Sequence, residues 1–228
     1  MFFLKWRESR ELAGRPGGRT PYALALLFAA AAILSKSSTV MLPVVLGLCS
    51  WWEEGRWRWR HAAPLTPFFL ISAAASVWTI WEQQFHAGAI GAEWAQTWPE
   101  RLIIAGRDVW FYLGKLAWPH PLIFIYPRWQ IDASHPLAYL PVLAATGALF
   151  FLWRRRNGWG RPLFFACAYF VVSLFPLLGF FNVYFFRFSF VADHFQYLAS
   201  MGPLALAGAG MTRLPALLER RKPQAKPG

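Results

Sequence analysis

The stretch "RFSFVADHFQYLAS", residues 187–200, gathers Arg187, Asp193, His194 and Tyr197 within eleven positions, between two strongly apolar runs. Ionisable groups beside membrane-embedded segments are costly unless they pair or face a hydrated cavity. Arg offers a two-pronged donor to phosphate, while Asp and Tyr can orient a ligand or bind its hydroxyl groups. If the stretch is helical, Asp193 and Tyr197 lie one turn apart. The residues therefore indicate a site for an anionic, hydroxyl-bearing ligand, and an Arg187–Asp193 ion pair that fastens an external loop is the structural alternative.

A second candidate cation is Lys36 in "ILSKSSTVMLP". Its ammonium can meet a phosphate head group, and the alternative is a snorkelling lysine that marks the membrane boundary. Cys49 and Cys167 both fall in apolar segments, the histidines show no metal-ligand spacing, and no phosphate-binding glycine loop occurs. The sequence therefore predicts no metal site and no cofactor, leaves a need for a divalent metal open, and assigns no catalytic residue.

The composition indicates the solvent that surrounds these residues. Hydrophobic residues make up 57% of the 228 positions and charged residues only 15%, more apolar surface than a soluble domain of this size normally buries. Six uncharged runs approach or reach the length of a membrane-spanning helix. They are 20–35, 37–52, 62–81, 136–153, 162–186 and 195–212, and the first two are predicted to form a tight pair around Lys36. We expect an all-α, polytopic membrane helix bundle that forms a single domain.

The positive charges predict how this bundle is oriented. Four clusters hold 17 of the 23 Lys and Arg residues and 5 of the 11 acidic residues, a surplus that equals the whole net charge of +12. The clusters are residues 5–19, 53–61, 154–161 and 213–226. Because Lys and Arg favour cytoplasmic loops, all four clusters are expected in the cytoplasm, with both termini and the tail 213–228. The basicity then reflects orientation and anionic membrane lipid, and nucleic acid is not an expected partner.

Residues 82–135 are expected to form one long external region. Within it, "RLIIAGRDVWFYLGKLAW" (101–118) carries charges every seven residues, which gives a helix one polar stripe beside an apolar face. We interpret it as an interfacial helix that lies on the outer surface or dips in without crossing. A connection of this length is typical of a lid or binding loop, although an amphipathic cap over the bundle is an equal alternative.

Three segments carry a family resemblance. They are "AILSKSSTVMLPVVLGLCSWW", "VWFYLGKLAWPHPLIFIYPRW" and "RFSFVADHFQYLASMG". In this order they resemble bacterial relatives of the transmembrane and tetratricopeptide-repeat protein O-mannosyltransferases, which belong to the GT-C glycosyltransferases. The resemblance covers residues 20–212. It implies an inner-membrane enzyme that takes a sugar from a polyprenyl phosphate at the outer face and passes it to a protein or glycan hydroxyl.

The resemblance also assigns residues and shows departures. It implies that Lys36, Arg187, Asp193, His194 and Tyr197 handle the lipid phosphate and the sugar, with Tyr126 and Arg128 as weaker candidates on the external region. Family members carry an acidic base in an external loop that precedes the matched segments, and many carry tetratricopeptide repeats after them. Since neither is found, the chain is expected to be a fragment of such an enzyme. A non-catalytic membrane scaffold and a transporter of lipid-linked sugars are the alternatives.

Overall fold

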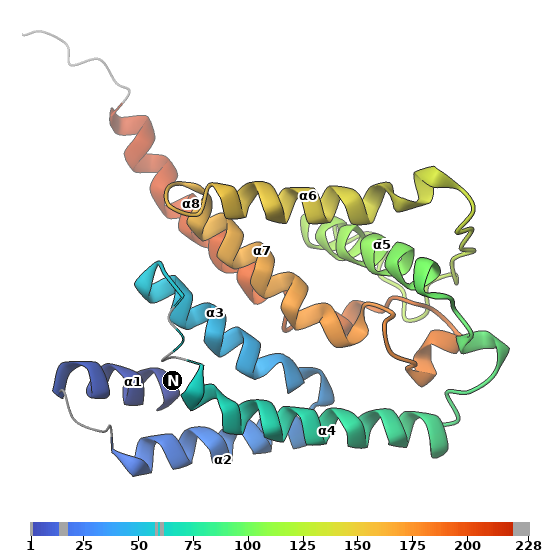
Figure 1. Ribbon diagram of the computed structural model, residues 1–228. Coiled ribbons are helices and arrows are strands. Elements are labelled where there is room, and N and C mark those ends of the chain that lie inside the picture. Colours follow the sequence, from blue (N-terminus) through green and yellow to red (C-terminus); the bar gives the residue numbers. More distant parts are fainter. Residues whose placement is uncertain (1, 14–17, 58, 60–61, 221–228) are drawn as a thin grey trace, which may run out of the picture.

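The computed structural model describes residues 2–13, 18–57, 59 and 62–220, with the backbone alone for residues 10–13 and 214–220. Within these residues the chain forms helices and turns and no strand, which confirms the all-α prediction. The α-helices are α1 (Phe2–Ala13), α2 (Arg19–Ser35), α3 (Leu42–Glu54), α4 (Thr66–Phe85), α5 (Trp98–Ala117), α6 (Leu140–Arg154), α7 (Gly160–Leu174) and α8 (Met201–Arg220) (Figure 1). The short 3-10 helices are η1 (Ser37–Met41), η3 (Ala63–Leu65), η4 (Ala92–Trp94), η5 (Pro136–Tyr139), η6 (Phe175–Leu177), η7 (Tyr184–Arg187) and η8 (Asp193–Phe195).

Proline sets the start of four helices. Pro43, Pro67, Pro99 and Pro141 each lie in the first turn of α3, α4, α5 and α6, where a missing N–H costs no helical hydrogen bond. Thr97 precedes α5, and its backbone N–H donates to the carboxylate of Glu100 at 2.6 Å. This capping arrangement fixes the point at which the chain turns into α5.

Three helices are long and apolar enough to span a membrane: Ala63–Phe85, Pro136–Arg154 and Gly160–Leu177. They correspond to the predicted runs 62–81, 136–153 and the first part of 162–186. The predicted tight pair is also present as α2 and η1–α3, with Lys36 in extended conformation (φ −152°, ψ 115°) at the turn between them. Of this pair, α2 has 17 residues and is shorter than each of the three candidate spans.

Two predicted spans end or begin elsewhere in the structure. The run 162–186 is helical only to Leu177, because Pro176 lacks a backbone donor and Gly179 adopts φ +82°. The run 195–212 becomes α-helical only at Met201, and α8 then continues to Arg220. Gly202 lets α8 start against the middle of α7, since a Cβ there would lie 2.8 Å from the Ala166 carbonyl oxygen. Residues 178–200 are therefore an irregular segment rather than parts of two helices.

The predicted interfacial helix, α5, has its polar stripe facing the protein. Arg101 bonds to the segment after α7, Asp108 is fully buried, and Lys115 bonds to Pro121. One hydrophobic cluster joins Val109 and Tyr112 of α5 to α7 and to the irregular segment. This helix is thus a central packing element whose polar stripe contacts other parts of the chain.

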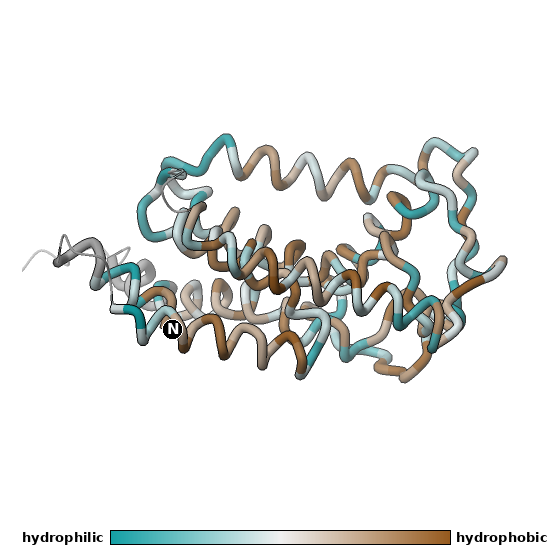
Figure 2. The backbone as a smooth tube through the Cα atoms, turned by 60° about the horizontal axis from the view of Figure 1, so that its bottom comes forward, coloured by the Kyte–Doolittle hydropathy of each residue, from teal (hydrophilic) through white to brown (hydrophobic). Residues whose placement is uncertain are grey.

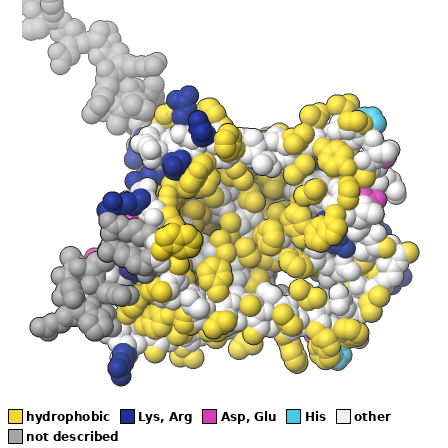
Figure 3. All heavy atoms as spheres, in the orientation of Figure 1, with side chains coloured by type: hydrophobic (Ala, Val, Ile, Leu, Met, Phe, Trp, Pro, Cys, Tyr) yellow, Lys and Arg dark blue, Asp and Glu magenta, His cyan; other side chains and the backbone are white. Residues whose placement is uncertain are grey.

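Charge and hydropathy separate along the long axis of the bundle. Hydrophobic residues predominate along the helices and hydrophilic residues at the turns (Figure 2). Most of the Lys and Arg side chains visible in Figure 3 lie at one end, on the left, where residues 54–57 and 155–160 turn between helices, and a few lie on the right. Arg7 pairs with Glu53 there, and Arg161 donates to the Trp52 carbonyl, so the first three basic clusters are in contact. Residues 14–17, 58, 60–61 and 221–228 of the predicted clusters and tail lie outside the described residues.

Candidate functional site

The irregular segment 178–200 forms most of the opposite end of the bundle, on the right of Figure 1. It leaves η6, makes the short turns η7 and η8, and returns to the middle of α7 where α8 begins. Gly179 is required near its start, because φ is +82° and a Cβ would lie 2.8 Å from Cγ2 of Ile104. This segment contains four of the seven predicted site residues, Arg187, Asp193, His194 and Tyr197.

Arg101 of α5 holds the start of this segment in place. Its guanidinium donates to the Gly179 carbonyl and to Oδ1 of Asn182, both at 2.7 Å, and to the carbonyl oxygens of Gln96 and Trp94 at 3.1 and 3.2 Å. Burial lowers the pKa of Arg101 from its ordinary value. Since four acceptors surround the guanidinium, Arg101 positions the segment and is not free to bind a ligand.

Asp193 and Tyr126 form the first contact of the candidate site. The Tyr126 hydroxyl lies 2.9 and 3.0 Å from the two carboxylate oxygens of Asp193 and 3.0 Å from the Pro121 carbonyl oxygen. The Lys115 ammonium lies 4.9 Å from the Tyr126 ring centroid and donates to the same carbonyl. The structure thus brings together two predicted residues that are 67 positions apart, with a lysine beside them.

Arg187 pairs with Glu93, contrary to the Arg187–Asp193 alternative. Its Nε lies 3.1 Å from Oε2 of Glu93, and the two side chains are 49% and 43% exposed. Arg128 donates to the Glu93 backbone carbonyl and stacks over the Phe190 ring at 4.9 Å. Two predicted cations therefore converge on one glutamate of η4.

Lys36 and Tyr197 form a third contact, with the ammonium 3.9 Å from the centre of the Tyr197 ring. This contact is a cation–π interaction between the turn after α2 and the irregular segment. The prediction that Asp193 and Tyr197 lie one helical turn apart is wrong. Residues 196–200 form turns, and the two side chains contact different partners. The His194 ring lies near two aromatic rings, with its centroid 6.4 Å from that of Phe124 and 6.0 Å from that of Phe185.

An open cavity of about 550 Å³ lies beside these contacts. It is lined by Leu122, Ile123, Phe124, Asp193 and His194, so a carboxylate and an imidazole face an otherwise apolar wall. Of the predicted site residues, Asp193 and His194 line this cavity. Lys36, Arg128 and Arg187 make their contacts with Tyr197 and Glu93 instead.

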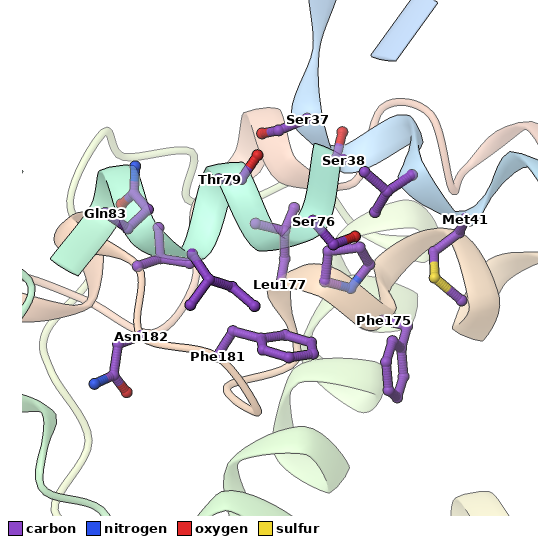
Figure 4. A pocket seen from close by; sticks show the side chains of 14 residues that line it. Ser37, Ser38, Met41, Ser76, Thr79, Gln83, Phe175, Leu177, Phe181 and Asn182 are labelled. Atoms are coloured by element: carbon purple, nitrogen blue, oxygen red, sulfur yellow. The ribbon is translucent and has the colours of Figure 1, made fainter. Parts of the chain in front are cut away.

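A second cavity of about 200 Å³ lies between η1, α4 and residues 175–183. In Figure 4 the hydroxyl groups of Ser37, Ser38, Ser76 and Thr79 lie on one side and the rings of Phe175 and Phe181 on the other. Its lining includes Gln83 and Asn182 but no charged side chain among the described residues. This cavity suits a neutral group, whereas the larger one has an acid at its wall.

Sequence reasoning missed three polar residues of this end. Glu93 was assigned no role, and Asp108 and Lys115 were considered only as members of the stripe on 101–118. The stripe was the available signal, since charges that recur on one face of an apolar helix need a polar neighbour. No group of three His, Cys, Asp or Glu in the described parts of the chain could hold a metal ion.

Comparisons with protein-family models, curated proteins and solved structures find no match to this chain.

Proposed function

We propose that the chain is the donor-binding membrane part of a GT-C type glycosyltransferase, and that the end formed by residues 178–200 binds a polyprenyl-phosphate sugar. The observation that carries the proposal is the return of this segment into the bundle. Asp193 and His194 of this segment line an open cavity with an apolar wall, Asp193 contacts Tyr126, and Tyr197 contacts Lys36. An apolar wall, a carboxylate and nearby cations are the features that a lipid-linked phosphosugar requires.

The cations have a defined task in this reaction. The oxygen of the acceptor hydroxyl bonds to the anomeric carbon, the bond from that carbon to the phosphate oxygen breaks, and the polyprenyl phosphate leaves with the electron pair. The hydroxyl proton passes to a base, which the family resemblance places in an external loop that precedes the matched segments. Lys36 and Arg187 would stabilise the negative charge that grows on the phosphate. Asp193, held by Tyr126, would bind a sugar hydroxyl.

The same proposal sets the orientation of the bundle. The basic end faces the cytoplasm and the site faces the outer surface of the inner membrane. Three helix pairs, α2 with α3, α4 with α6, and α7 with α8, then cross and return. The last return is made jointly by residues 188–200 and α8, because α8 begins beside the middle of α7.

Binding of a polyprenyl-phosphate hexose to the purified chain in nanodiscs tests the proposal. We expect saturable binding that weakens at least about tenfold in Lys36→Ala and in Arg187→Ala, since a charge-assisted contact contributes ~1.5–3 kcal/mol. Arg56→Ala, at the basic end, is the matched control and should bind like the wild type. Equal binding by all three variants, or no saturable binding by the wild type, would overturn the assignment.

A non-catalytic scaffold is the second candidate, and one observation favours it. Arg187 and Asp193 already have protein partners, Glu93 and Tyr126, which is the arrangement of a charged loop that serves only to fasten the bundle. Absence of saturable donor binding by the wild type would support the scaffold. Glu93→Gln separates the two further: a scaffold loses stability, whereas a binding site gains a freed Arg187 and keeps or strengthens its hold on phosphate.

A further inference from the structure

A groove of about 350 Å³ lies away from this site, between α6 and α7, with α5 and α8 completing its wall. The residues that line it include Trp110, Leu113, Ala145, Leu149, Phe170 and Leu206. Among its described lining residues there is no Asp, Glu, Lys, Arg or His. Two of its walls, α6 and α7, belong to the candidate membrane spans, so the groove lies within the hydrocarbon layer of the proposed orientation.

The walls of the groove are tied together at both ends. At one end α5 crosses α6 so closely that a Cβ on Gly106 would lie 2.4 Å from the Val142 backbone nitrogen. At the other end α6 and α7 are joined by a short turn, where a Cβ on Gly160 would lie 2.6 Å from Cβ of Arg155. Packed helices lie about 8–10 Å apart, and a third helix between α6 and α7 would need them separated by roughly twice that distance. The groove therefore admits a slender occupant and not another helix.

Between these two ties α6 stands away from the bundle. None of its residues is buried, and a Cβ on Gly147 would meet no atom within 4 Å. Figure 3 shows the face below α6 hollowed and lined by hydrophobic side chains, with Lys and Arg gathered at the left edge. An apolar groove that opens sideways into a bilayer is filled by hydrocarbon, since water finds no polar partner there.

One end of the groove leads to a run of cations. Leu152 lines the groove, and after Trp153 the chain continues with Arg154, Arg155 and Arg156. These three guanidinium groups contact the rings of Phe150, Phe151 and Trp153 and make no ion pair with any acid in the described residues. Three cations without an acidic partner among the described residues, at the mouth of an apolar groove, are complementary to a ligand with an anionic head and an apolar chain.

We propose that this groove holds one acyl chain of an anionic phospholipid from the cytoplasmic leaflet, with its phosphate at Arg154–Arg156. The chain lies along Ala145, Leu149 and Phe170 and fills the space that α6 leaves against α7. The head group supplies a negative charge beside the three arginines, where the described residues provide no ion pair. This lipid site lies at the opposite end from the candidate sugar site and does not depend on it.

Native mass spectrometry of the full chain in detergent, titrated with phosphatidylglycerol or phosphatidylcholine, tests the proposal. We expect the wild type to bind one phosphatidylglycerol at least tenfold more tightly than phosphatidylcholine. The double variant Arg155→Gln, Arg156→Gln should lose this preference, and Ala145→Trp, which fills the groove, should lose the bound lipid of either kind. Both changes leave the helix ties at Gly106 and Gly160 intact.

Two control variants make the test decisive. Arg19→Gln removes an exposed cation on α2, and Ala73→Trp adds bulk to an exposed position of α4, neither of which lines the groove. Both should bind phosphatidylglycerol like the wild type. The proposal fails if Ala145→Trp retains the lipid, if the arginine variant keeps its preference for phosphatidylglycerol, or if the controls lose binding to the same extent.

Discussion

Asp108 of α5 is fully buried, and neither of its carboxylate oxygens has a hydrogen-bond partner among the described residues. Desolvation raises the pKa of this carboxyl well above its ordinary value, so the folded chain keeps it protonated. The unfolded chain ionises it near pH 4. The contribution of Asp108 to stability is therefore complete below about pH 4 and is lost as the pH rises through the raised pKa.

Replacing Asp108 with Asn should remove this dependence on pH. An amide of the same shape cannot ionise, so we expect the thermal midpoint of Asp108→Asn to fall less between pH 4 and pH 8 than that of the wild type. Thermal unfolding in detergent across this range measures the difference. Asp132→Asn is the control, because Asp132 is exposed and its pKa is instead lowered by hydrogen bonds from Ser134. Parallel pH curves for wild type and Asp108→Asn would contradict the protonated state.

Residue types along 187–197 predicted that a polar group would occupy this end, but not how its members pair. Arg187 and Asp193 were weighed as partners because they are close in sequence. In the structure each finds a partner from the external region, Glu93 for Arg187 and Tyr126 for Asp193. These separations of 67 and 94 positions depend on the packing of α5 against residues 178–200, which local sequence patterns do not encode.

At the level of elements, hydropathy predicted which runs are helical better than it predicted where they end. The limits of α2, α4 and α6 lie close to those of the uncharged runs. The predicted helix limits of the runs 162–186 and 195–212 are wrong. An apolar run does not by itself specify a helix, and the aromatic side chains of residues 180–190 can be buried equally well by an irregular segment. Pro176, Gly179 and Pro203 were the available signals for the two boundaries.

A substitution at Gly179 tests directly why the helix that starts at Gly160 ends where it does. Ala at this position is strained by the positive φ and by the 2.8 Å approach of its Cβ to Ile104, so Gly179→Ala should lower the free energy of unfolding by about 1–3 kcal/mol. Gly147→Ala in α6 meets no atom within 4 Å and should be neutral or stabilising. Thermal unfolding of both variants in the same detergent provides the comparison. Equal midpoints would mean that residue 179 is free to leave the left-handed conformation.

At the level of the whole molecule, charge distribution was the most informative sequence feature. Four clusters separated by apolar runs predicted that one end of the bundle is basic, and the described members of the clusters lie at that end. The number of membrane-spanning helices was predicted less well. The run 195–212 was counted as a span because of its length, but its α-helix begins only at Met201, beside the middle of α7. The prediction that the basic clusters share one end does not depend on the exact limits of any helix, since it depends only on how many times the chain reverses direction between clusters.

The orientation of the two ends in a membrane can be measured by labelling of single cysteines. After Cys49→Ser and Cys167→Ser, the substitutions Arg56→Cys and Asn157→Cys probe the basic end, while Gln130→Cys and His135→Cys probe the opposite end; all four positions are exposed. With an impermeant maleimide, intact spheroplasts should label positions 130 and 135 alone, and inverted membrane vesicles positions 56 and 157 alone. The reason is electrostatic, because the basic end is retained in the cytoplasm. Labelling of positions 56 and 130 from the same side would contradict both the membrane-spanning arrangement and the placement of the candidate sugar site at the outer surface.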